Sequence, residues 1–285
     1  MSLPAPQDRA VTLEVAALLQ GRRWVALTGA GCSTESGIPD YRGPDSKPRT
    51  PIQFKDFMAS EQARARYWAR SRRGWPHFSR ARPNPSHHAL AELETAGLVG
   101  IITQNVDRLH QRAGSRRVVD LHGALEEVLC LGCGALSDRE ELQRRLEEAN
   151  PGEQAEVPLA PDGDAEGESG EGFSVPACLR CGGILKPHVV FFGENVPPPR
   201  LAEAKALFGQ AECLLVAGSS LTVFSGYRFV RWAAEAGIPV VILNQGPTRG
   251  DPLATLKWEQ RTGVALPELG RVLRGSPMLR EKDRE

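Results

Sequence analysis

Short apolar runs alternate with amphipathic segments along most of the chain, and each kind predicts a different element. Buried strands are predicted at 24–27, 98–103, 118–121, 189–192, 213–217 and 239–243. Helices are predicted at 11–20, 52–73, 87–96, 201–208 and 226–236, the third of them capped by Ser86 behind Pro85. Strands that alternate with helices in this way indicate an α/β domain with a parallel sheet.

The stretch that holds two cysteine pairs departs from this pattern. Residues 150–172 are rich in Gly, Pro, Glu and Asp and have almost no large apolar side chains, so a solvated loop is expected over 161–172. We therefore expect a discontinuous, Rossmann-like domain over 1–129 and 184–285, interrupted by a small zinc-ribbon module over 130–183.

Two C-x-x-C pairs provide the candidate metal ligands of this module, which are Cys130, Cys133, Cys178 and Cys181. Four thiolates make up the tetrahedral shell that Zn²⁺ prefers, and a complete shell leaves no open position for substrate. The pattern thus predicts one structural zinc ion. A redox-active C-x-x-C pair is the alternative interpretation of the same spacing.

Charge and hydropathy give no indication that the protein binds nucleic acid or a membrane. Lys+Arg and Asp+Glu both number 35, so the formal net charge is zero and nothing indicates binding to nucleic acid or to an anionic membrane. No apolar run reaches the roughly 18 residues of a membrane helix. Residues 1–10 lack the apolar core of a secretory signal. We expect a cytoplasmic monomer that has neither nucleic acid nor membrane as a partner.

A glycine-rich turn follows the first predicted strand. Gly29-x-Gly31 can bring the backbone close to a pyrophosphate, although Thr34 stands where the third glycine of a dinucleotide fingerprint would be. A purely structural turn is the rival interpretation. The polar segment 35–43 that follows is suited to fold over a ligand, with Arg42 near a phosphate. Asp40 and Tyr41 would line the same cavity.

These residues, together with several later motifs, resemble the sirtuin family. The matching segments follow the family's order and span roughly 24–262: 29–33, 37–42, 103–107, 121–123, the two cysteine pairs, 186–194, 218–221 and 243–244. The resemblance is closer to class II sirtuins, the branch that includes a mitochondrial member, on the segments 67–70, 74–76, 113–117, 160–164 and 225–228.

The resemblance implies that NAD lies in a cleft between the α/β domain and the zinc module. The residues that it implies as cofactor contacts are Gly29, Ala30, Gly31, Ser33, Thr34, Asp40, Tyr41, Arg42, Gln104, Asn105, Val106, Asp107, Gly218, Ser219, Ser220, Asn244, Gln245, Gly246 and Thr262. Backbone groups of the first loop would hold the pyrophosphate, and Asn244 with its neighbours would hold the adenosine end.

The implied activity is NAD-dependent removal of acyl groups from lysine, with nicotinamide and O-acyl-ADP-ribose as products. His122 is the expected general base, since a His pKa of about 6.5 suits proton transfer near neutral pH. Asn105 is expected to orient the ribose and a water, and Asp107 to hold the carboxamide of nicotinamide. In the bare sequence a lone histidine is more often structural.

The acyl-lysine peptide is expected to add as a strand between two segments, 192–194 and 223–226, with Phe192, Gly193, Glu194 and Val223 as contacts. Tyr67 and Arg70 share one helix face and resemble a pair that binds acidic acyl groups. The alternatives are that both residues only pack the helix, or that the acyl group is long and apolar.

Two departures from the family pattern stand out. Many sirtuins carry Val-x-Pro after the second serine-bearing loop, whereas Val223-Phe224 is followed here by Ser225-Gly226. Cys32 stands where an aliphatic residue is common, and we interpret it as a small buried apolar residue. Two other functions remain open: mono-ADP-ribosyl transfer to a protein acceptor, and an NAD-sensing or ADP-ribose-sensing zinc module without turnover.

Overall fold

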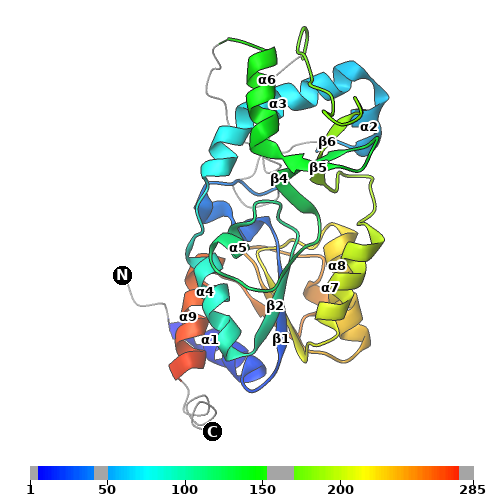
Figure 1. Ribbon diagram of the computed structural model, residues 1–285. Helices are drawn as coiled ribbons and strands as arrows, with labels where there is room; N and C mark the ends of the chain where they lie inside the picture. Colours follow the sequence, from blue (N-terminus) through cyan, green and yellow to red (C-terminus); the bar gives the residue numbers. More distant parts are fainter. Residues whose placement is uncertain (1–5, 42–50, 153–169, 276–285) are drawn as a thin grey trace.

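The computed structural model describes residues 6–41, 51–152 and 170–275. It consists of a large α/β unit with a smaller unit stacked on one end (Figure 1). None of the helices in these ranges is both long enough and apolar enough to cross a membrane. Arg42 and most of the predicted loop 161–172 lie outside the described residues.

The large unit is built on a six-stranded parallel sheet of order β3-β2-β1-β7-β8-β9. The strands are β1 (Trp24–Thr28), β2 (Leu98–Thr103), β3 (Val118–Asp120), β7 (Cys213–Ala217), β8 (Val240–Leu243) and β9 (Leu256–Trp258). Every residue of β1, β7 and β8 is buried, as expected for strands covered on both faces. The predicted Rossmann-like sheet is therefore confirmed.

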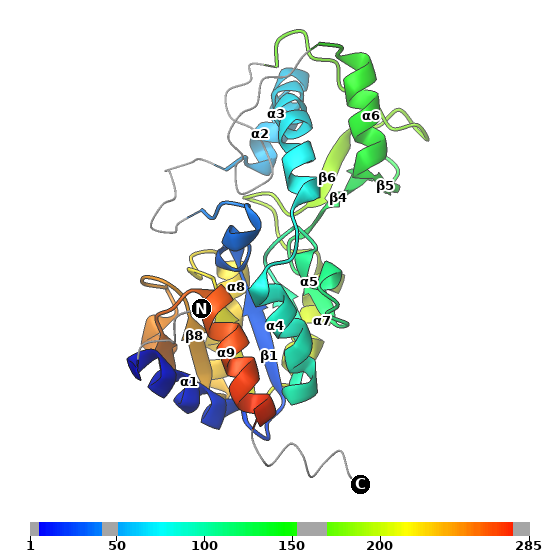
Figure 2. The ribbon, with the colours of Figure 1, turned by 90° about the vertical axis from the view of Figure 1, so that its left-hand side faces the viewer.

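Helices cover both faces of this sheet. On one face lie α1 (Pro6–Leu19), α4 (Pro85–Leu93) and α9 (Thr262–Gly275), which Figure 2 shows side by side. Leu19, Leu90 and Leu269 join one hydrophobic cluster there. On the other face lie α7 (Pro198–Phe208) and α8 (Phe224–Glu235), where Leu207 and Phe229 belong to a second cluster. The short elements are α5 (Leu109–Arg112), η3 (Glu94–Ala96) and η4 (Asp251–Leu253).

The cap of α4 differs from the prediction. Asn84, not Ser86, is the N-cap, and its side chain accepts a hydrogen bond of 2.8 Å from Ser86 N. Pro85 occupies the first helical position, which suits a residue that has no N–H. The Ser86 hydroxyl instead donates to Thr262 Oγ1 at 2.8 Å and thus ties α4 to the start of α9.

The small unit contains an antiparallel sheet of order β5-β4-β6, formed by β4 (Gly123–Cys130), β5 (Leu136–Asp138) and β6 (Leu185–Val189). Its helices are α2 (Phe54–Ala59), α3 (Glu61–Arg80) and α6 (Arg139–Ala149). Phe57, Trp68, Val128 and Leu146 share one hydrophobic cluster. The first three of these lie outside the predicted module 130–183, because α2 and α3 pack on its sheet and most of β4 precedes residue 130.

One predicted strand is wrong in place and in partner. The strand expected over 189–192 in the parallel sheet is β6, which ends at Val189 and pairs antiparallel with β4. Beyond it, Phe192 forms only an isolated bridge with Gln53. An apolar run indicates burial but does not say which sheet the run will join.

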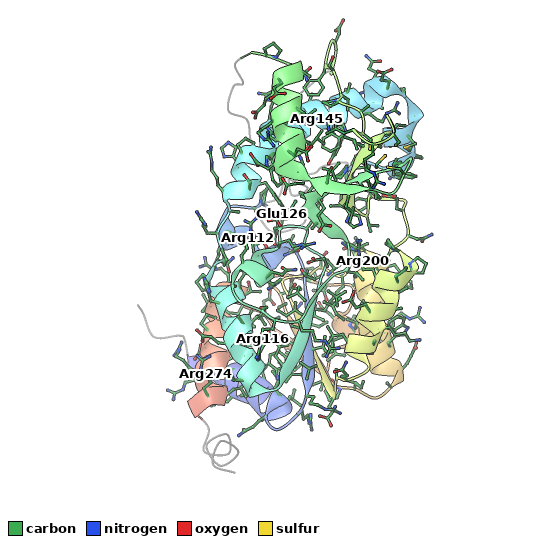
Figure 3. The ribbon with its side chains drawn as sticks, viewed as in Figure 1. Arg112, Arg116, Glu126, Arg145, Arg200 and Arg274 are labelled. Atoms are coloured by element: carbon green, nitrogen blue, oxygen red, sulfur yellow. The ribbon has the colours of Figure 1, made fainter. Side chains whose placement is uncertain are left out.

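Polar side chains join the two units. Arg112 of α5 forms an ion pair with Glu126 of β4 (Figure 3). His188 Nδ1 lies 2.7 Å from Glu127 Oε2, and its Nε2 lies 3.2 Å from Arg200 Nη2 at the start of α7. Arg112 and Arg200 of the large unit thus contact β4 and β6 of the small unit.

Candidate active site

The cavity that holds most of the predicted site lies at the carboxyl edge of the parallel sheet. The strand order changes direction between β1 and β7, the point at which open α/β sheets bind ligands. Loops that follow β1, β2, β7 and β8 line the cavity, as do residues of the small unit. Its volume is about 1000 Å³, which is room for a dinucleotide and part of a second substrate.

The glycine loop after β1 folds into two short turns, η1 (Ala30–Cys32) and η2 (Thr34–Ser36), instead of a long helix. A Cβ at Gly29 would lie 2.8 Å from Gly218 O, and one at Gly31 would lie 2.9 Å from Gly218 Cα. Gly31 N donates to Gly218 O at 2.9 Å. The glycines are therefore required for close contact between the loops after β1 and β7, whatever ligand lies above them.

A buried hydrogen-bond network supports this loop from the end of β2. Asn105 Nδ2 donates to Gly29 O and to Ser33 Oγ, both at 3.0 Å. Ser33 Oγ donates in turn to Asp107 Oδ2 at 2.7 Å, and Leu109 N donates to Asp107 Oδ1 at 2.9 Å. Burial raises the pKa of Asp107, which these two hydrogen bonds oppose. The network orients Asn105 and Asp107 before any ligand arrives.

His122 follows β3 and lines the same cavity. Its Nδ1 lies 3.0 Å from Gln104 O, and its Nε2 lies 2.7 Å from Ser225 Oγ. Burial lowers the pKa of His122 to about 4; the charges of Arg200 and Arg228 add to this, and the bond to Gln104 opposes it. Because a carbonyl oxygen can only accept, Nδ1 carries the proton and Nε2 presents its lone pair, as a general base must.

The structure brings together every predicted cofactor residue within its described ranges. The cavity is lined by Gly29, Ala30, Gly31, Ser33, Thr34, Asp40, Tyr41, Gln104, Asn105, Val106, Asp107, Gly218, Ser219, Ser220, Asn244, Gln245, Gly246 and Thr262. Gln104 Nε2 donates to Ser219 Oγ at 2.8 Å, which joins the loops after β2 and β7.

The predicted substrate residues are split. Tyr67, Phe192, Gly193, Glu194 and Val223 line the cavity, whereas Arg70 is not among the lining residues. The expected strand pairing along 223–226 is wrong beyond its first residue, because α8 begins at Phe224. Val223 is extended, but its carbonyl already accepts from Gly226 N and Tyr227 N, both at 3.2 Å.

Several polar lining residues were not predicted as site residues, Arg228 and Arg261 among them, and Ser225 was expected only as part of the peptide-pairing segment 223–226. Ser225 lies in the segment that departs from the Val-x-Pro pattern, so that departure was the available signal. Arg228 follows Ser225 at i+3 on α8, a spacing that places both on one helix face. Arg261 forms an ion pair of 3.1 Å with Glu35 and so links the glycine loop to the start of α9.

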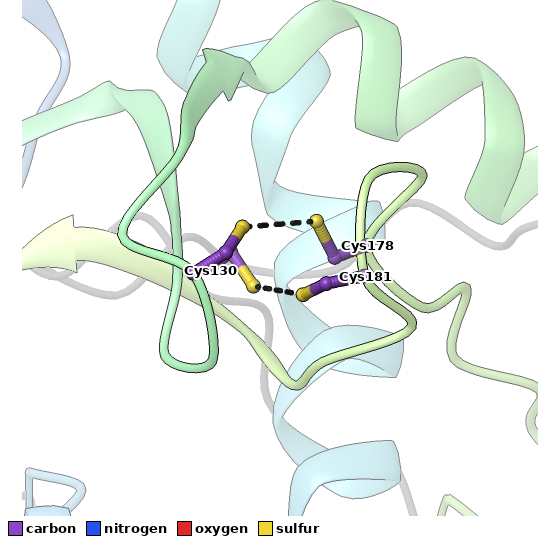
Figure 4. Close-up of side chains that lie close together, drawn as sticks. Cys130, Cys178 and Cys181 are labelled. Carbon is purple, nitrogen blue, oxygen red and sulfur yellow. Dashed lines mark hydrogen bonds between the residues drawn. The ribbon is translucent and has the colours of Figure 1, made fainter.

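The four cysteines of the small unit meet at one point. All four sulfur atoms lie within 4.8 Å of one another, with 3.5 Å between Cys130 and Cys181 and 3.9 Å between Cys133 and Cys178 (Figure 4). Sulfurs at the corners of a tetrahedral Zn–S₄ site would be about 3.8 Å apart. The donor set and its spacing therefore fit one structural zinc ion.

The two remaining cysteines lie in the core of the large unit. Cys32 is 1% exposed, and its thiol donates to Ala217 O at 3.4 Å. Burial raises the pKa of Cys32 to about 12 and that of Cys213 to about 11. A thiol that stays protonated is a poor nucleophile, so the interpretation of Cys32 as a small buried apolar residue is supported.

Sequence comparison decides the family. A model of the Sir2 family matches residues 29–225, more than half of the chain. The chain belongs to the Sir2 family. The matched range covers the glycine loop, His122, both cysteine pairs and the segment up to Ser225, so all the motifs that carried the resemblance to sirtuins except 243–244 lie within it.

Several relatives of this Sir2 protein are named for an activity. NAD-dependent protein deacetylase 1 of Mycobacterium avium (strain 104) is 54% identical over 256 residues, which cover 87% of this chain and 91% of the relative. NAD-dependent protein deacetylase 1 of Streptomyces coelicolor is 55% identical over 259 residues, which cover 89% of this chain and 85% of the relative. These matches identify the family, and the class II assignment stays a prediction.

Solved Sir2 structures share the fold. One described as Sir2–p53 peptide–NAD⁺ has a TM-score of 0.74 and 34% identity, and the match covers 92% of this chain and 98% of that one. Another, of a Sir2 protein bound to a propionylated peptide, has a TM-score of 0.71 and 33% identity, with 94% and 99% covered. The likeness therefore extends over both units of this Sir2 protein.

The lining residues of this Sir2 protein fit NAD. The cavity lies at the turn in strand order, two glycine-bearing loops meet there, and amide side chains of Gln104, Asn105 and Asn244 line it. Amide and hydroxyl groups of this kind can hold ribose hydroxyls and a carboxamide. Backbone N–H groups of the loops would hold the pyrophosphate.

Proposed function

We propose that this chain is an NAD-dependent protein-lysine deacylase that releases nicotinamide and O-acyl-ADP-ribose. The observation that carries the proposal is which ring nitrogen of His122 bears the proton. Its hydrogen bond to Gln104 O leaves Nε2 as an acceptor on the wall of a cavity that suits a dinucleotide. The names of the relatives, NAD-dependent protein deacetylase, support the same activity.

Bound NAD supplies a ribose carbon whose bond to nicotinamide breaks as the acyl oxygen of the lysine attacks it. Asp107 lies at the base of the glycine loop, where its carboxyl can hold the carboxamide of the leaving group. Asn105 has its amide fixed by Gly29 O and Ser33 Oγ, so it can orient the ribose without rearranging. His122 Nε2 is then the base for the proton that leaves a ribose hydroxyl, and loss of this proton makes that oxygen a nucleophile.

The peptide is proposed to lie in extended form beside residues 192–194 and Val223. Phe192 O already accepts from Phe54 N at 2.9 Å, so peptide pairing would use the backbone groups of this segment that remain. Pairing through the backbone depends little on side chains, and we expect loose preference among target sequences. Related Sir2 structures that hold a p53 peptide and a propionylated peptide support peptide substrates.

We further propose that the acyl group is apolar and can be longer than acetyl. The residues that line the cavity include the apolar Ile52 and Phe191 and the aromatic Tyr67. Tyr67 is 2% exposed and stacks edge-on against Phe57 and Phe191, with centroids 5.4 and 5.3 Å away. Since Arg70 does not line the cavity, a carboxylate on the acyl group would lack the cation predicted for it.

The test uses peptides that carry acetyl, succinyl, glutaryl, hydroxymethylglutaryl, lipoyl and myristoyl lysine. Mass spectrometry follows the deacylated peptide and the O-acyl-ADP-ribose formed with NAD. We expect turnover in the wild type, none in His122→Ala, and normal turnover in His77→Ala, which removes an exposed histidine of α3.

The outcomes separate the alternatives. Release of nicotinamide with ADP-ribose attached to an acceptor, and no deacylated peptide, would replace the proposal by ADP-ribosyl transfer. Binding of NAD without any turnover would indicate a sensor. A preference for succinyl or glutaryl lysine that disappears in Arg70→Met would overturn the apolar acyl preference alone.

A further inference from the structure

Ser225 contacts the atom of His122 that must take the proton. It is the second residue of α8, and its Oγ lies 2.7 Å from His122 Nε2. Both residues line the cavity. The two residues are 103 positions apart in the sequence, and the segment of Ser225 is the one that departs from the Val-x-Pro pattern.

The direction of this hydrogen bond follows from the other side of the ring. Gln104 O can only accept, so His122 Nδ1 donates to it and Nε2 has no proton. Ser225 Oγ must therefore donate to Nε2. An imidazole nitrogen has one lone pair in the ring plane, and the hydroxyl of Ser225 occupies it.

The backbone beside Ser225 holds this arrangement in place. Gly226 follows it, and a Cβ there would lie 2.4 Å from Gln104 Oε1. Gly226 N and Tyr227 N both donate to Val223 O and so close the first turn of α8. Gln104 and the start of α8 thus fit against each other, and they set both hydrogen bonds of the imidazole at once.

We propose that Ser225 is a further catalytic residue, which relays the proton from the ribose to the base; this inference rests on the proposed function. Ser225 Oγ takes the proton of a ribose hydroxyl as it gives its own proton to His122 Nε2. The ribose oxygen keeps the electron pair of its broken O–H bond and uses it to attack the acyl carbon. His122 becomes an imidazolium, and Ser225 ends as a neutral hydroxyl.

The competing mechanism is displacement. In that mechanism the ribose hydroxyl replaces Ser225 as the hydrogen-bond partner of Nε2. Ser225 would then only compete with the ribose for His122. Removal of its hydroxyl would then leave the rate unchanged or raise it. A relay predicts the opposite sign, so one substitution distinguishes the two.

The first measurement needs no NAD. In ¹⁵N NMR spectra of the free protein, His122 is expected as a neutral ring with a protonated Nδ1 and an unprotonated Nε2. Ser225→Ala should move the Nε2 signal away from its hydrogen-bonded position, and Ser225→Thr should keep it. An Nε2 signal that does not respond to Ser225→Ala would overturn the proposed hydrogen bond.

The second measurement separates the chemical steps. For Ser225→Ala we expect deacylation to slow roughly 10- to 100-fold, in the lower range of general acid–base effects. Exchange of labelled nicotinamide, which precedes the proton transfer, should stay within about twofold. Ser225→Thr should keep most of the deacylation rate. Ser79→Ala, which removes the hydroxyl of a serine in α3, should keep the full rate.

A proton inventory completes the test. Two protons moving together in the wild type should give a curved dependence of the rate on the deuterium fraction, and Ser225→Ala should give a straight line. Deacylation by Ser225→Ala at or above the wild-type rate would overturn the relay and leave the deacylase proposal intact. Absence of deacylation in the wild type itself would remove the proposed function instead.

Discussion

Gly226 lies so close to Gln104 that no side chain fits between them: a Cβ at residue 226 would be 2.4 Å from Gln104 Oε1 and 2.6 Å from its Cδ. The Gln104 amide also donates to Ser219 Oγ, and its backbone carbonyl accepts from His122. A single contact at the start of α8 thus bears on the cofactor loop and on the proposed base.

Gly226→Ala should push the Gln104 side chain out of its position. We expect the hydrogen bond to Ser219 to break and KM for NAD to rise roughly tenfold, the effect of about one lost hydrogen bond. Steady-state kinetics with varied NAD measure this. Gly209→Ala is the control, since Gly209 is exposed at a φ of −62° and a Cβ there meets no atom closer than 3.4 Å. Equal KM values for both variants would contradict the prediction.

The pH profile should report the burial of His122. Burial lowers the pKa of His122 to about 4, so the neutral base persists well below pH 6.5. We expect kcat/KM for the peptide to fall only as the pH drops toward about 4, within the range where the protein stays folded. An acid limb near 6.5 assigned to His122 would contradict this environment.

The same shift affects stability. A histidine whose pKa is lower in the folded state than in the unfolded state takes up a proton when the protein unfolds at a pH between the two values. Stability is therefore lost as the pH falls from about 6.5 toward 4. Burial also lowers the pKa of His87 to about 4, so it contributes in the same direction. Denaturant unfolding at pH 7.5 and 5.5 measures the change, and greater stability at the lower pH would speak against it.

Loss of zinc should unfold the small unit first. Cys130 and Cys178 belong to the hydrophobic cluster that also holds Trp68 and Leu146, so the metal site and the core support each other. We expect one zinc per chain by metal analysis, and loss of both zinc and activity in Cys178→Ser. Cys213→Ser, a buried cysteine of β7, should keep its zinc. Full zinc content in Cys178→Ser would refute the four-cysteine shell.

Lys186 is buried and forms an ion pair with the partly exposed Glu194, and disruption of this pair should lower the stability of the fold. Lys186 Nζ lies 2.9 Å from Glu194 Oε2 and 4.3 Å from the centre of the Phe191 ring, and the lysine side chain is 4% exposed. Glu194→Ala leaves that charge unpaired, so we expect a loss of roughly 2–3 kcal/mol in the free energy of unfolding. The exposed pair of Arg231 and Glu235 provides the control.

Glu235→Ala should cost less than about 1 kcal/mol, as surface ion pairs do. The double variant Lys186→Met/Glu194→Gln should be less destabilised than Glu194→Ala, because no unpaired charge remains. Urea unfolding of the three variants measures these differences. A Glu194→Ala variant as stable as Glu235→Ala would show that the pair contributes little.

Local patterns in the sequence were enough for the core of the fold. The runs at Trp24, Leu98, Cys213 and Val240 are strands of one parallel sheet because each is apolar at nearly every position, and a sheet covered on both faces buries such runs. The two C-x-x-C pairs likewise indicate zinc binding by their residue type and spacing alone. Apolar runs and closely spaced cysteine pairs can be recognised within a short stretch of sequence.

The positions of polar partners could not be predicted in this way. Ser225 and His122 meet only because the start of α8 packs against the end of β3, and no local pattern of either segment encodes the other. Gly29 and Gly31 resemble a phosphate-binding loop in the sequence. In the structure, however, a side chain at either position would clash with Gly218, which is nearly 190 residues away. The same limit explains why Val189, expected to start a strand of the parallel sheet, instead ends a strand of the small sheet.

The buried strands, the glycine turn and the four-cysteine site could thus be predicted from local sequence, since burial and metal chemistry follow from residue type and short spacing. Which hydroxyl contacts the base, which helices complete the small unit and which predicted residues line the cavity became known from the packing of the folded chain. Those outcomes depend on contacts between distant segments, whose geometry is set by how complete elements pack.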